Sequence, residues 1–461
     1  MPHLNEPARK SPLPIIFLTI FVDLISFSII FPLFPKMLTY YLGAQPSASL
    51  LGQMRDWITS VSGPGESAKQ AVLFGGILGS IFSLLQFLFA PFWGSLSDRI
   101  GRRPVLLVTI GGITISYVIW FFSSSFELLV LARFLGGIMG GNLSTATAAV
   151  ADSTTREKRS SGMALIGVAF GLGFILGPTL GGILSTVDLT ETWPSLVRFG
   201  LNPFSAVAGV AGILSTWNFI WVLTRFEETL RDEDRGKALE GRRTINPLRL
   251  FGHVDIKGVN AVNLITFAYL TAFSGMEFTL TFLAADRFGY TPKTTAWLFL
   301  FSGLVLVVVQ GGMIRQLAPL YGEKALAIVG LLCVIPGFAL VGWAPREGAL
   351  YLGLGLMSIG SGFVTPSTSS LVSLYTPSDR QGSVLGIFRS LGSLARAVGP
   401  LLGCWAYWHF SAQVAYYVAA GLLFLPVLVA CTLPLPRKNE LETAGPTGPA
   451  TNASCDGAST R

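Results

Sequence analysis

Charged residues and chemically reactive side chains are scarce in this sequence. Only 12% of its 461 residues are Asp, Glu, Lys or Arg, whereas a soluble domain has about a quarter. Composition therefore excludes a soluble globular protein. The three histidines (His3, His253 and His409) are widely separated and the four cysteines show no paired spacing, which argues against a metal site and a disulfide framework. We expect neither an enzyme nor a bound cofactor.

Long apolar runs dominate what is present. Hydrophobic residues make up 51% of the chain, and the mean hydropathy is +0.60. A bilayer span takes about 20 mostly apolar residues, and its backbone groups must be hydrogen-bonded within the segment. Twelve such stretches begin near Pro14, Val72, Pro104, Glu127, Gly162, Phe204, Val259, Thr294, Ala325, Ala349, Ser383 and Gln413. We therefore predict an all-α membrane protein with twelve transmembrane helices.

The net charge of +7 is explained by membrane topology. If both termini lie on one side, that side holds 22 of the 32 Lys and Arg residues and the other side holds seven. Basic residues accumulate in cytoplasmic loops, so both termini are predicted to be cytoplasmic. We expect the plasma membrane, with an intracellular membrane as the alternative. The positive net charge is therefore weak evidence for a nucleic-acid partner, and we expect none.

Two long connections and two tails organise the chain. The stretch at 225–258 is apolar-poor with mixed charges, and reads as a cytoplasmic linker between two six-helix bundles. The predicted divisions are a cytoplasmic N-terminal tail at 1–13, a first bundle at 14–224, the linker, a second bundle at 259–433, and a disordered cytoplasmic tail at 434–461.

A short repeat relates the two bundles. The run GPTLG at 177–181 reappears as GPLLG at 399–403, at the same place in each half. This match indicates a duplicated six-helix unit. Transporters often contain such repeats, with the substrate site between them near the middle of the bilayer.

The loop between the second and third stretches has the sequence GSLSDRIGRR at 94–103. Its glycines allow a tight turn at the membrane surface, and its arginines suit the cytoplasmic side. Without any family resemblance, the loop would be explained as a tight cytoplasmic turn between two helices, with basic residues on the cytoplasmic side. The spacing resembles the G-x-L-x-D-R-x-G-R-R signature of the major facilitator superfamily, which implies a twelve-helix transporter. In that resemblance the gating-loop residues are Gly94, Asp98, Arg99, Gly101, Arg102 and Arg103.

Small residues line one face of the fifth stretch. Gly173, Gly177 and Gly181 share a face that allows close helix packing, and Pro178 permits a bend. Ordinary packing would explain this pattern. Together with Gly182, it also resembles the antiporter motif of the superfamily, which favours drug-type exporters over uniporters and symporters.

Five ionisable residues lie deep within the apolar stretches. Each costs about 2.5 kcal/mol or more at the bilayer centre unless it is paired or faces water. They are Asp23, Arg133, Glu277, Arg389 and Arg396. Buried ion pairs between helices would be one explanation. The other is a central aqueous cavity with excess positive charge, which suits an anionic substrate.

The functional explanation gives these residues separate roles. A carboxylate in a poorly solvated site can alternate between its ionised and protonated forms, so Glu277 is the preferred proton carrier. Asp23, with Pro32 and Pro35, resembles the first-span aspartate of drug–proton antiporters and is a second candidate. Guanidinium groups bind carboxylates bidentately. The predicted substrate-binding residues are therefore Arg389, Arg396, Arg133 and Ser393.

Residues 14–433 as a whole resemble the tetracycline-transporter-like branch of animals. The segments that carry the resemblance include FGGILGSIFSLLQFLFAP at 74–91 and FRSLGSLARAVGPLLG at 388–403. That branch is similar to bacterial tetracycline exporters and is linked to organic anions. The expected second-half counterpart of the loop signature, GGMIR at 311–315, lacks the acid, so a gate role is assigned only to the Asp98 loop.

These observations predict a monomeric secondary transporter that works by alternating access. Its expected ligands are small amphipathic organic anions or tetracycline-like drugs, moved by proton-coupled efflux or exchange. A proton-independent anion exchanger or facilitator is the main alternative, and a non-transporting membrane receptor is a further one. A receptor would have little reason to keep three buried arginines.

Overall fold

The chain is helical throughout the part that the structure describes. In the computed structural model this part comprises residues 12–44, 52–53, 56, 67–154, 159–230, 254–377 and 381–435. The predicted tails and most of the predicted linker lie outside these residues, so the domain boundaries stay predictions.

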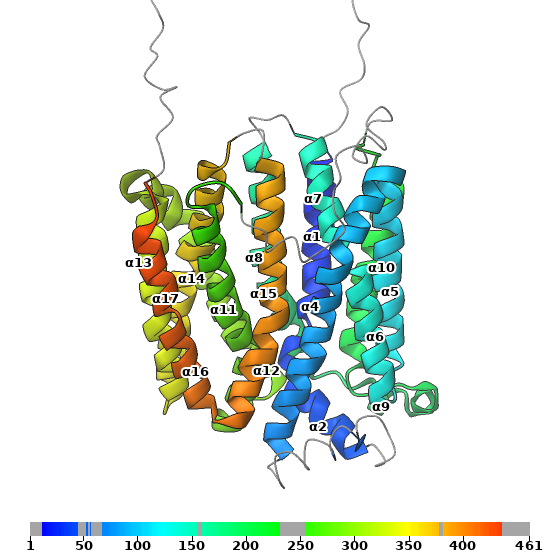
Figure 1. Ribbon diagram of the computed structural model, residues 1–461. Coiled ribbons are helices and arrows are strands. Elements are labelled where there is room, and N and C mark those ends of the chain that lie inside the picture. The colour runs from blue at the N-terminus through cyan, green and yellow to red at the C-terminus, as the bar shows by residue number, and fades with distance from the viewer. Residues whose placement is uncertain are drawn as a thin grey trace, which may run out of the picture.

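The helices form two consecutive groups (Figure 1). The first group consists of α1 (Leu13–Ser28), η1 (Phe31–Leu33), α2 (Phe34–Ala44), α4 (Ser67–Ile100), α5 (Arg102–Phe121), α6 (Phe126–Met139), α7 (Asn142–Asp152), α8 (Arg159–Leu184), α9 (Leu189–Thr192), η2 (Pro194–Phe199) and α10 (Ser205–Arg225). The second consists of α11 (Val259–Phe288), α12 (Pro292–Val308), the π-helical turn η6 (Val309–Met313), α13 (Ile314–Trp343), α14 (Glu347–Tyr375), α15 (Gln381–His409), α16 (Ala412–Leu422) and α17 (Phe424–Thr432).

These helices account for the twelve predicted crossings. Ten stretches among the described residues are long and apolar enough to span a membrane. One of them, Pro292–Trp343, is 52 residues long and turns at Gly322, so it crosses twice. Helix α15, which carries two arginines, supplies the remaining crossing with its 29 residues. The prediction of an all-α, twelve-helix membrane protein is confirmed.

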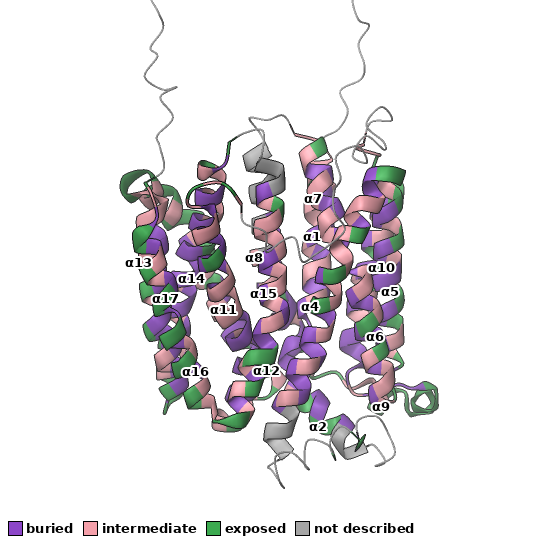
Figure 2. Cartoon of the chain, in the orientation of Figure 1, coloured by how far each residue is buried: buried purple, intermediate pink, exposed green. Residues whose placement is uncertain are grey.

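The outer surface suits a lipid environment. Exposed residues lie along the outer helices (Figure 2). Large apolar side chains are among them, such as Ile213 on α10 at 69% and Leu428 on α17 at 65%. An exposed apolar belt of this kind marks a membrane contact rather than a soluble surface.

A matching pair of turns supports the duplication. Gly101, between α4 and α5, has φ 107° and ψ 159°. Gly322, within α13, has φ 78° and ψ 159°, and lies 221 residues later. Both conformations favour glycine because positive φ is strained for side-chain-bearing residues. The predicted counterpart of the loop at 311–315 was therefore wrong, because Gly311 and Gly312 lie in the π-helical turn η6 and the second-half turn comes about ten residues later.

A second pair of contacts repeats between the halves. The Ser28 hydroxyl of α1 donates to the Gly173 carbonyl of α8, with an O···O distance of 3.1 Å. The Ser274 hydroxyl of α11 donates to the Ala395 carbonyl of α15 at 3.2 Å. Gly173 and Ala395 each stand four residues before the glycine of a Gly-Pro pair. The first and fifth crossings of each half are thus joined in the same way.

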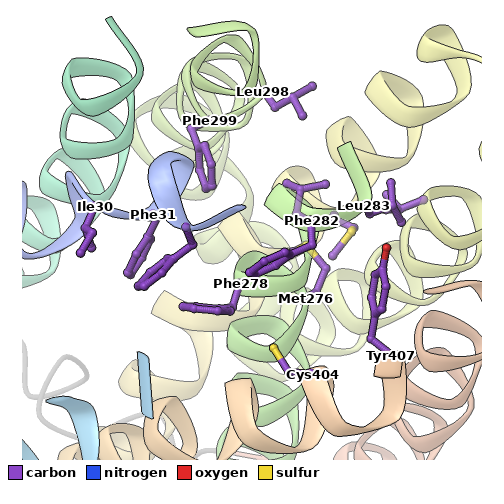
Figure 3. Packing of buried hydrophobic residues seen from close by; sticks show 14 of the residues in the cluster. Ile30, Phe31, Met276, Phe278, Phe282, Leu283, Leu298, Phe299, Cys404 and Tyr407 are labelled. Carbon is purple, nitrogen blue, oxygen red and sulfur yellow. The ribbon is translucent and has the colours of Figure 1, made fainter. Parts of the chain in front are cut away.

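The two halves pack tightly against each other at one end of the helix bundle. We call the side where α1 begins and α17 ends the terminal face, and the opposite side the far face (Figure 1). Near the far face Phe31 points toward Phe278 (Figure 3), and the Phe34 and Phe278 ring centroids are 4.6 Å apart. Gly76 of α4 lies directly against Cys404 of α15.

Toward the terminal face the same helices separate. Helices α4 and α15 diverge in that direction (Figure 1). A Cβ placed on Gly94 of α4 would meet only Ser144 of its own half, and one on Gly386 of α15 would meet nothing within 4 Å. The structure is therefore sealed at the far face and spread at the terminal face.

Candidate transport site

A cavity lies between the helices of the first half and is also lined by one residue of the second. It encloses about 670 Å³ of space between atoms, part of it open to solvent. Four aromatic side chains form much of its wall: Phe27, Tyr117, Phe82 and Phe174. Arg396 of α15 is the one lining residue contributed by the second half. An apolar wall with few polar groups is typical of a small-molecule site.

Asp23 lies in this cavity and is held by two amides. The Nδ2 atom of Asn142 on α7 donates to one carboxylate oxygen. The Nδ2 atom of Asn218 on α10 donates to the other at 3.1 Å. Amide hydrogens can only donate, so this arrangement fits the ionised carboxylate. Asp23 thus joins three helices, and its predicted part in proton coupling stays a prediction.

Arg133 lies behind the cavity wall. Its side chain is 4% exposed, and its guanidinium carbon is 4.6 Å from the Phe82 ring centroid and 5.7 Å from that of Phe27. Its Nε and Nη2 atoms have no hydrogen-bond partner among the described residues. The two rings stabilise its charge by cation–π contact and separate it from the cavity. Its predicted role in substrate binding therefore requires these rings to move.

Arg396 and Glu277 lie on neighbouring helices of the second half. Helices α11 and α15 approach closely, because the Ser274 hydroxyl bonds to the carbonyl of Ala395, the residue before Arg396. Glu277 lies three residues after Ser274 on α11, so this contact brings its carboxylate into the neighbourhood of the Arg396 guanidinium on α15. The Nη2 atom of Arg396 also donates to the Ser393 hydroxyl at 3.3 Å. The structure thus brings three of the predicted site residues together.

Arg389 does not share this position. It lies seven residues, or about 10 Å along the helix axis, closer to the terminal face than Arg396, and it is absent from the cavity lining in the described part of the chain. Its side chain is half-buried. The prediction that it holds substrate stays untested, and the cavity geometry favours Arg396.

The gating loop forms an ion-pair cluster at the terminal face. The Arg102 guanidinium donates to Asp98 at 2.6 Å and to Asp152 of α7 at 2.8 Å. The Arg103 Nη2 atom donates to the Leu223 carbonyl at the end of α10, at 2.7 Å. Arg99 is exposed. The cluster ties α4, α5, α7 and α10 into one unit.

Glu228 is a part of this cluster that sequence reasoning missed. Its carboxylate accepts the backbone N–H groups of Arg102 at 2.8 Å and Arg103 at 3.1 Å, at the start of α5. It also accepts those of Thr229 and Leu230, each at 3.0 Å. A carboxylate at a helix N-terminus satisfies otherwise unpaired donors. In the sequence it stood in a mixed-charge stretch with no pattern to single it out, as did Asp152.

The predicted antiporter motif forms a close helix contact. A Cβ on Gly173 would meet Leu24 of α1, one on Gly177 would meet the Ser28 hydroxyl, and one on Gly181 would meet the Ile29 carbonyl. Gly182 instead faces Pro292 of α12, across the boundary between halves. Pro178 lies inside α8 without ending it. These contacts account for the glycines by packing and leave the coupling mode open.

The comparisons with known proteins decide the family. The model of the Major Facilitator Superfamily matches residues 16–319 and 313–454. The chain belongs to the Major Facilitator Superfamily. It is 36% identical to mouse major facilitator superfamily domain-containing protein 10 over 450 residues, covering 93% of this chain and 94% of the mouse protein. It is 28% identical to the class B tetracycline resistance protein of Escherichia coli over 366 residues, covering 77% and 86%.

Solved structures agree. The crystal structure of the human organic anion transporter MFSD10 (TETRAN) is 35% identical, with a TM-score of 0.72, and the match covers 92% of this chain and 100% of that one. A D-xylose–proton symporter shares the fold at 16% identity and a TM-score of 0.69. The chain is thus a multi-pass membrane protein and a secondary transporter of small molecules, not an enzyme. The predicted family and the resemblance to tetracycline transporters are confirmed.

Proposed function

We propose that this protein moves small amphipathic organic anions across the membrane by alternating access, coupled to protons. The observation that carries the proposal is Arg396, the guanidinium that the second half places in the wall of the first half's aromatic cavity. A ligand bound there would touch both halves, which is what a substrate that controls their rocking must do.

The guanidinium donors and the aromatic rings of the cavity wall favour an amphipathic anion. Asp23, the acid in the wall, is bonded to two amides that hold it in place. Arg396 presents a planar set of donors, which matches carboxylate and sulfonate groups. Aromatic rings beside it suit the apolar body of an amphipathic ligand. The human relative described as an organic anion transporter supports the same substrate class.

The packing supports alternating access. The far face is sealed by small residues and aromatic rings, such as Gly76 against Cys404 and Phe34 against Phe278. Such contacts can separate without leaving buried charges unpaired. With both termini in the cytoplasm, as the basic loops favour, this structure is the cytoplasm-facing state. The Asp98 loop then serves as the gate at the terminal face, in a protein that works as a monomer in the plasma membrane.

Proton coupling is assigned to the two acids near the cavity. Glu277 lies near Arg396 and is half-buried, so a change of access would change how readily it holds a proton. Asp23 is the second candidate. The competing proposal, an exchanger or facilitator without protons, predicts substrate flux that ignores an imposed pH gradient.

Transport by reconstituted variants tests the substrate site. Uptake of labelled organic anions, with tetracycline alongside, is measured for Arg396→Ala, Arg389→Ala and Arg133→Ala. We expect Arg396→Ala to abolish anion uptake while protein yield and monodispersity are kept. Arg198→Ala is the matched control, since Arg198 is exposed on η2 far from the cavity. Retained transport in both α15 variants together with its loss in Arg133→Ala would refute the Arg396 site.

A further inference from the structure

Glu277 and Arg396 lie on helices that are joined by the Ser274–Ala395 hydrogen bond, and this position has a consequence for how protons and anions are coupled. Arg396 lies beside the α11 segment that carries Glu277 and also lines the cavity. One guanidinium therefore serves two possible acidic partners, the Glu277 carboxylate and the anionic group of a ligand. Both cannot be neutralised by it at the same time.

We propose that an anion and a proton bind together and cross the membrane together. The anion neutralises Arg396 in place of Glu277, and Glu277 then takes up a proton from the solvent on the open side. This inference rests on the proposed anion site and defines its coupling mode. It assigns cotransport, whereas the predicted antiport would require proton and substrate to compete.

The charge count of each occupancy state explains the coupling. With the cavity empty and Glu277 ionised, Arg396 and Glu277 sum to zero. With an anion bound and Glu277 protonated, Arg396 and the anion again sum to zero. A bound anion without the proton leaves one extra negative charge, and a proton without the anion leaves one extra positive charge. An uncompensated charge in a poorly solvated site is strongly unfavourable, so the two neutral states dominate.

In the described part of the chain, the helices packed around Glu277 add no further charge to the sum of Arg396, Glu277 and the anion. On its own helix, about two turns before Glu277, lies Tyr269, whose uncharged hydroxyl donates to Ser361 of α14 at 2.5 Å. Helix α4 faces the cavity with Ser83 and Gln86, both uncharged. Aromatic side chains of η1, α2 and α12 pack around α11 near the far face. Its outward neighbour α16 approaches with the uncharged Tyr416 hydroxyl, which donates to the Met276 carbonyl at 3.4 Å.

The charged groups of the first half form a separate set. Asp23 and Arg133 carry opposite charges, and both lie in the first half near Tyr117. Asp23 is hydrogen-bonded to Asn142 and Asn218 in the open state. These two charges offset each other whether or not the anion is present. Arg389 lies about two turns away from Arg396 toward the terminal face, so it adds the same field to every occupancy state.

Linkage makes the inference measurable. If anion binding promotes protonation of Glu277, then lower pH must strengthen anion binding by the same factor. For one coupled proton the affinity rises by at most about tenfold for each unit of pH decrease. It levels off once Glu277 is protonated without the anion. Antiport predicts the opposite sign.

The experiment is calorimetric titration of the purified full-length protein with p-toluenesulfonate, which stays ionised between pH 5 and 8. Titrations in two buffers of different ionisation enthalpy give the number of protons taken up per anion. We expect affinity to rise as pH falls, with net proton uptake approaching one per anion. Glu277→Gln should bind with an affinity independent of pH and without proton uptake. Glu191→Gln, an exposed acid far from the cavity, should behave as the unaltered protein does.

The outcomes separate this inference from the proposed function. Anion binding with proton release, or with no proton exchange, overturns cotransport and leaves the anion site standing. Proton uptake that persists in Glu277→Gln overturns the role of Glu277. Absence of binding by p-toluenesulfonate, benzoate and other aromatic anions at every pH overturns the anion site, and the inference with it. If Glu277 serves only to hold α11 against α15, Glu277→Gln lowers thermal stability without removing the pH dependence.

Discussion

Replacing Gly76 by alanine should release the seal at the far face. A Cβ at this position would lie 2.6 Å from the Cys404 Cβ, 2.9 Å from its Sγ and 3.0 Å from the Pro400 carbonyl oxygen. Carbon atoms pack at about 3.5–4.0 Å, so α4 and α15 must move apart by about 1 Å where they cross. Other conformations, in which these helices have separated, do not bear this penalty.

The size of the effect follows from overpacking. Extra methyl groups in a packed contact cost about 1–3 kcal/mol, which corresponds to a shift of about 5- to 150-fold in the equilibrium between the two open states. Gly76→Ala should therefore favour the state open at the far face. The substitution tests whether this crossing closes the molecule or merely lies beside the closure.

Cysteine labelling reports the shift directly. Cys404 is fully buried, at 0% exposure, so a membrane-impermeant maleimide applied from the far side should label it slowly. In a background where the other three cysteines are serine, Gly76→Ala should speed labelling of Cys404 by a similar factor. Gly212→Ala is the matched control, because a Cβ there lies 3.6 Å from Tyr117 in ordinary contact.

A rescue variant separates gating from misfolding. Cys404→Gly removes the two closest atoms, so any transport that Gly76→Ala loses should be recovered in Gly76→Ala/Cys404→Gly. Equal labelling rates in Gly76→Ala and the parent protein, with transport intact, would refute the assignment of this contact as the seal.

Substitutions at three further contacts test stability. Asn142→Ala or Asn218→Ala removes a hydrogen bond to the Asp23 carboxylate and should lower the free energy of unfolding by about 1.5–3 kcal/mol. The loss should be seen as a lower melting midpoint in detergent. An unchanged midpoint for both variants would contradict a stabilising role for these two bonds. Arg102→Ala removes the cation that binds both Asp98 and Asp152, and should lower the free energy of unfolding by about 3–5 kcal/mol. Arg99→Ala is the control, because the Arg99 side chain is exposed, and it should change the free energy of unfolding by less than about 0.5 kcal/mol. Glu228→Ala should cost about 0.5–2 kcal/mol by uncapping α5, and protection of the first α5 amides from hydrogen exchange that matches the parent would argue against the cap.

Much of the fold could be predicted because bilayer physics leaves a strong signal. Long apolar runs predicted the crossings, and the tight turn at Gly101 followed from the loop signature. The corresponding turn in the second half was misplaced. The counterpart of the loop signature was placed at 311–315, yet Gly311 and Gly312 lie in a π-helical turn, and the positive φ of the second-half turn is at Gly322. The sequence alone does not distinguish a glycine pair inside an apolar helix from a glycine in a turn.

The candidate site was only partly predictable for a different reason. Helical periodicity places Arg389 and Arg396 on one face, but which of them meets the cavity depends on where α4 and α15 diverge. That divergence is a property of the packed halves. The roles of Asn142 and Asn218 were missed because an amide that holds a carboxylate from another helix leaves no local pattern. Arg133 looked like a binding residue until two phenylalanine rings were found between it and the cavity.

The central claim is tested most directly by proton movement that accompanies anion flux. Proteoliposomes loaded with a pH-sensitive dye receive an inward gradient of labelled p-toluenesulfonate. We expect the lumen to acidify as the anion enters, and both signals to vanish in Arg396→Gln. In Glu277→Gln, labelled anion should still exchange for unlabelled anion while the lumen pH stays constant. Anion entry with a constant or rising lumen pH in the unaltered protein, or no anion entry at all, would contradict the account.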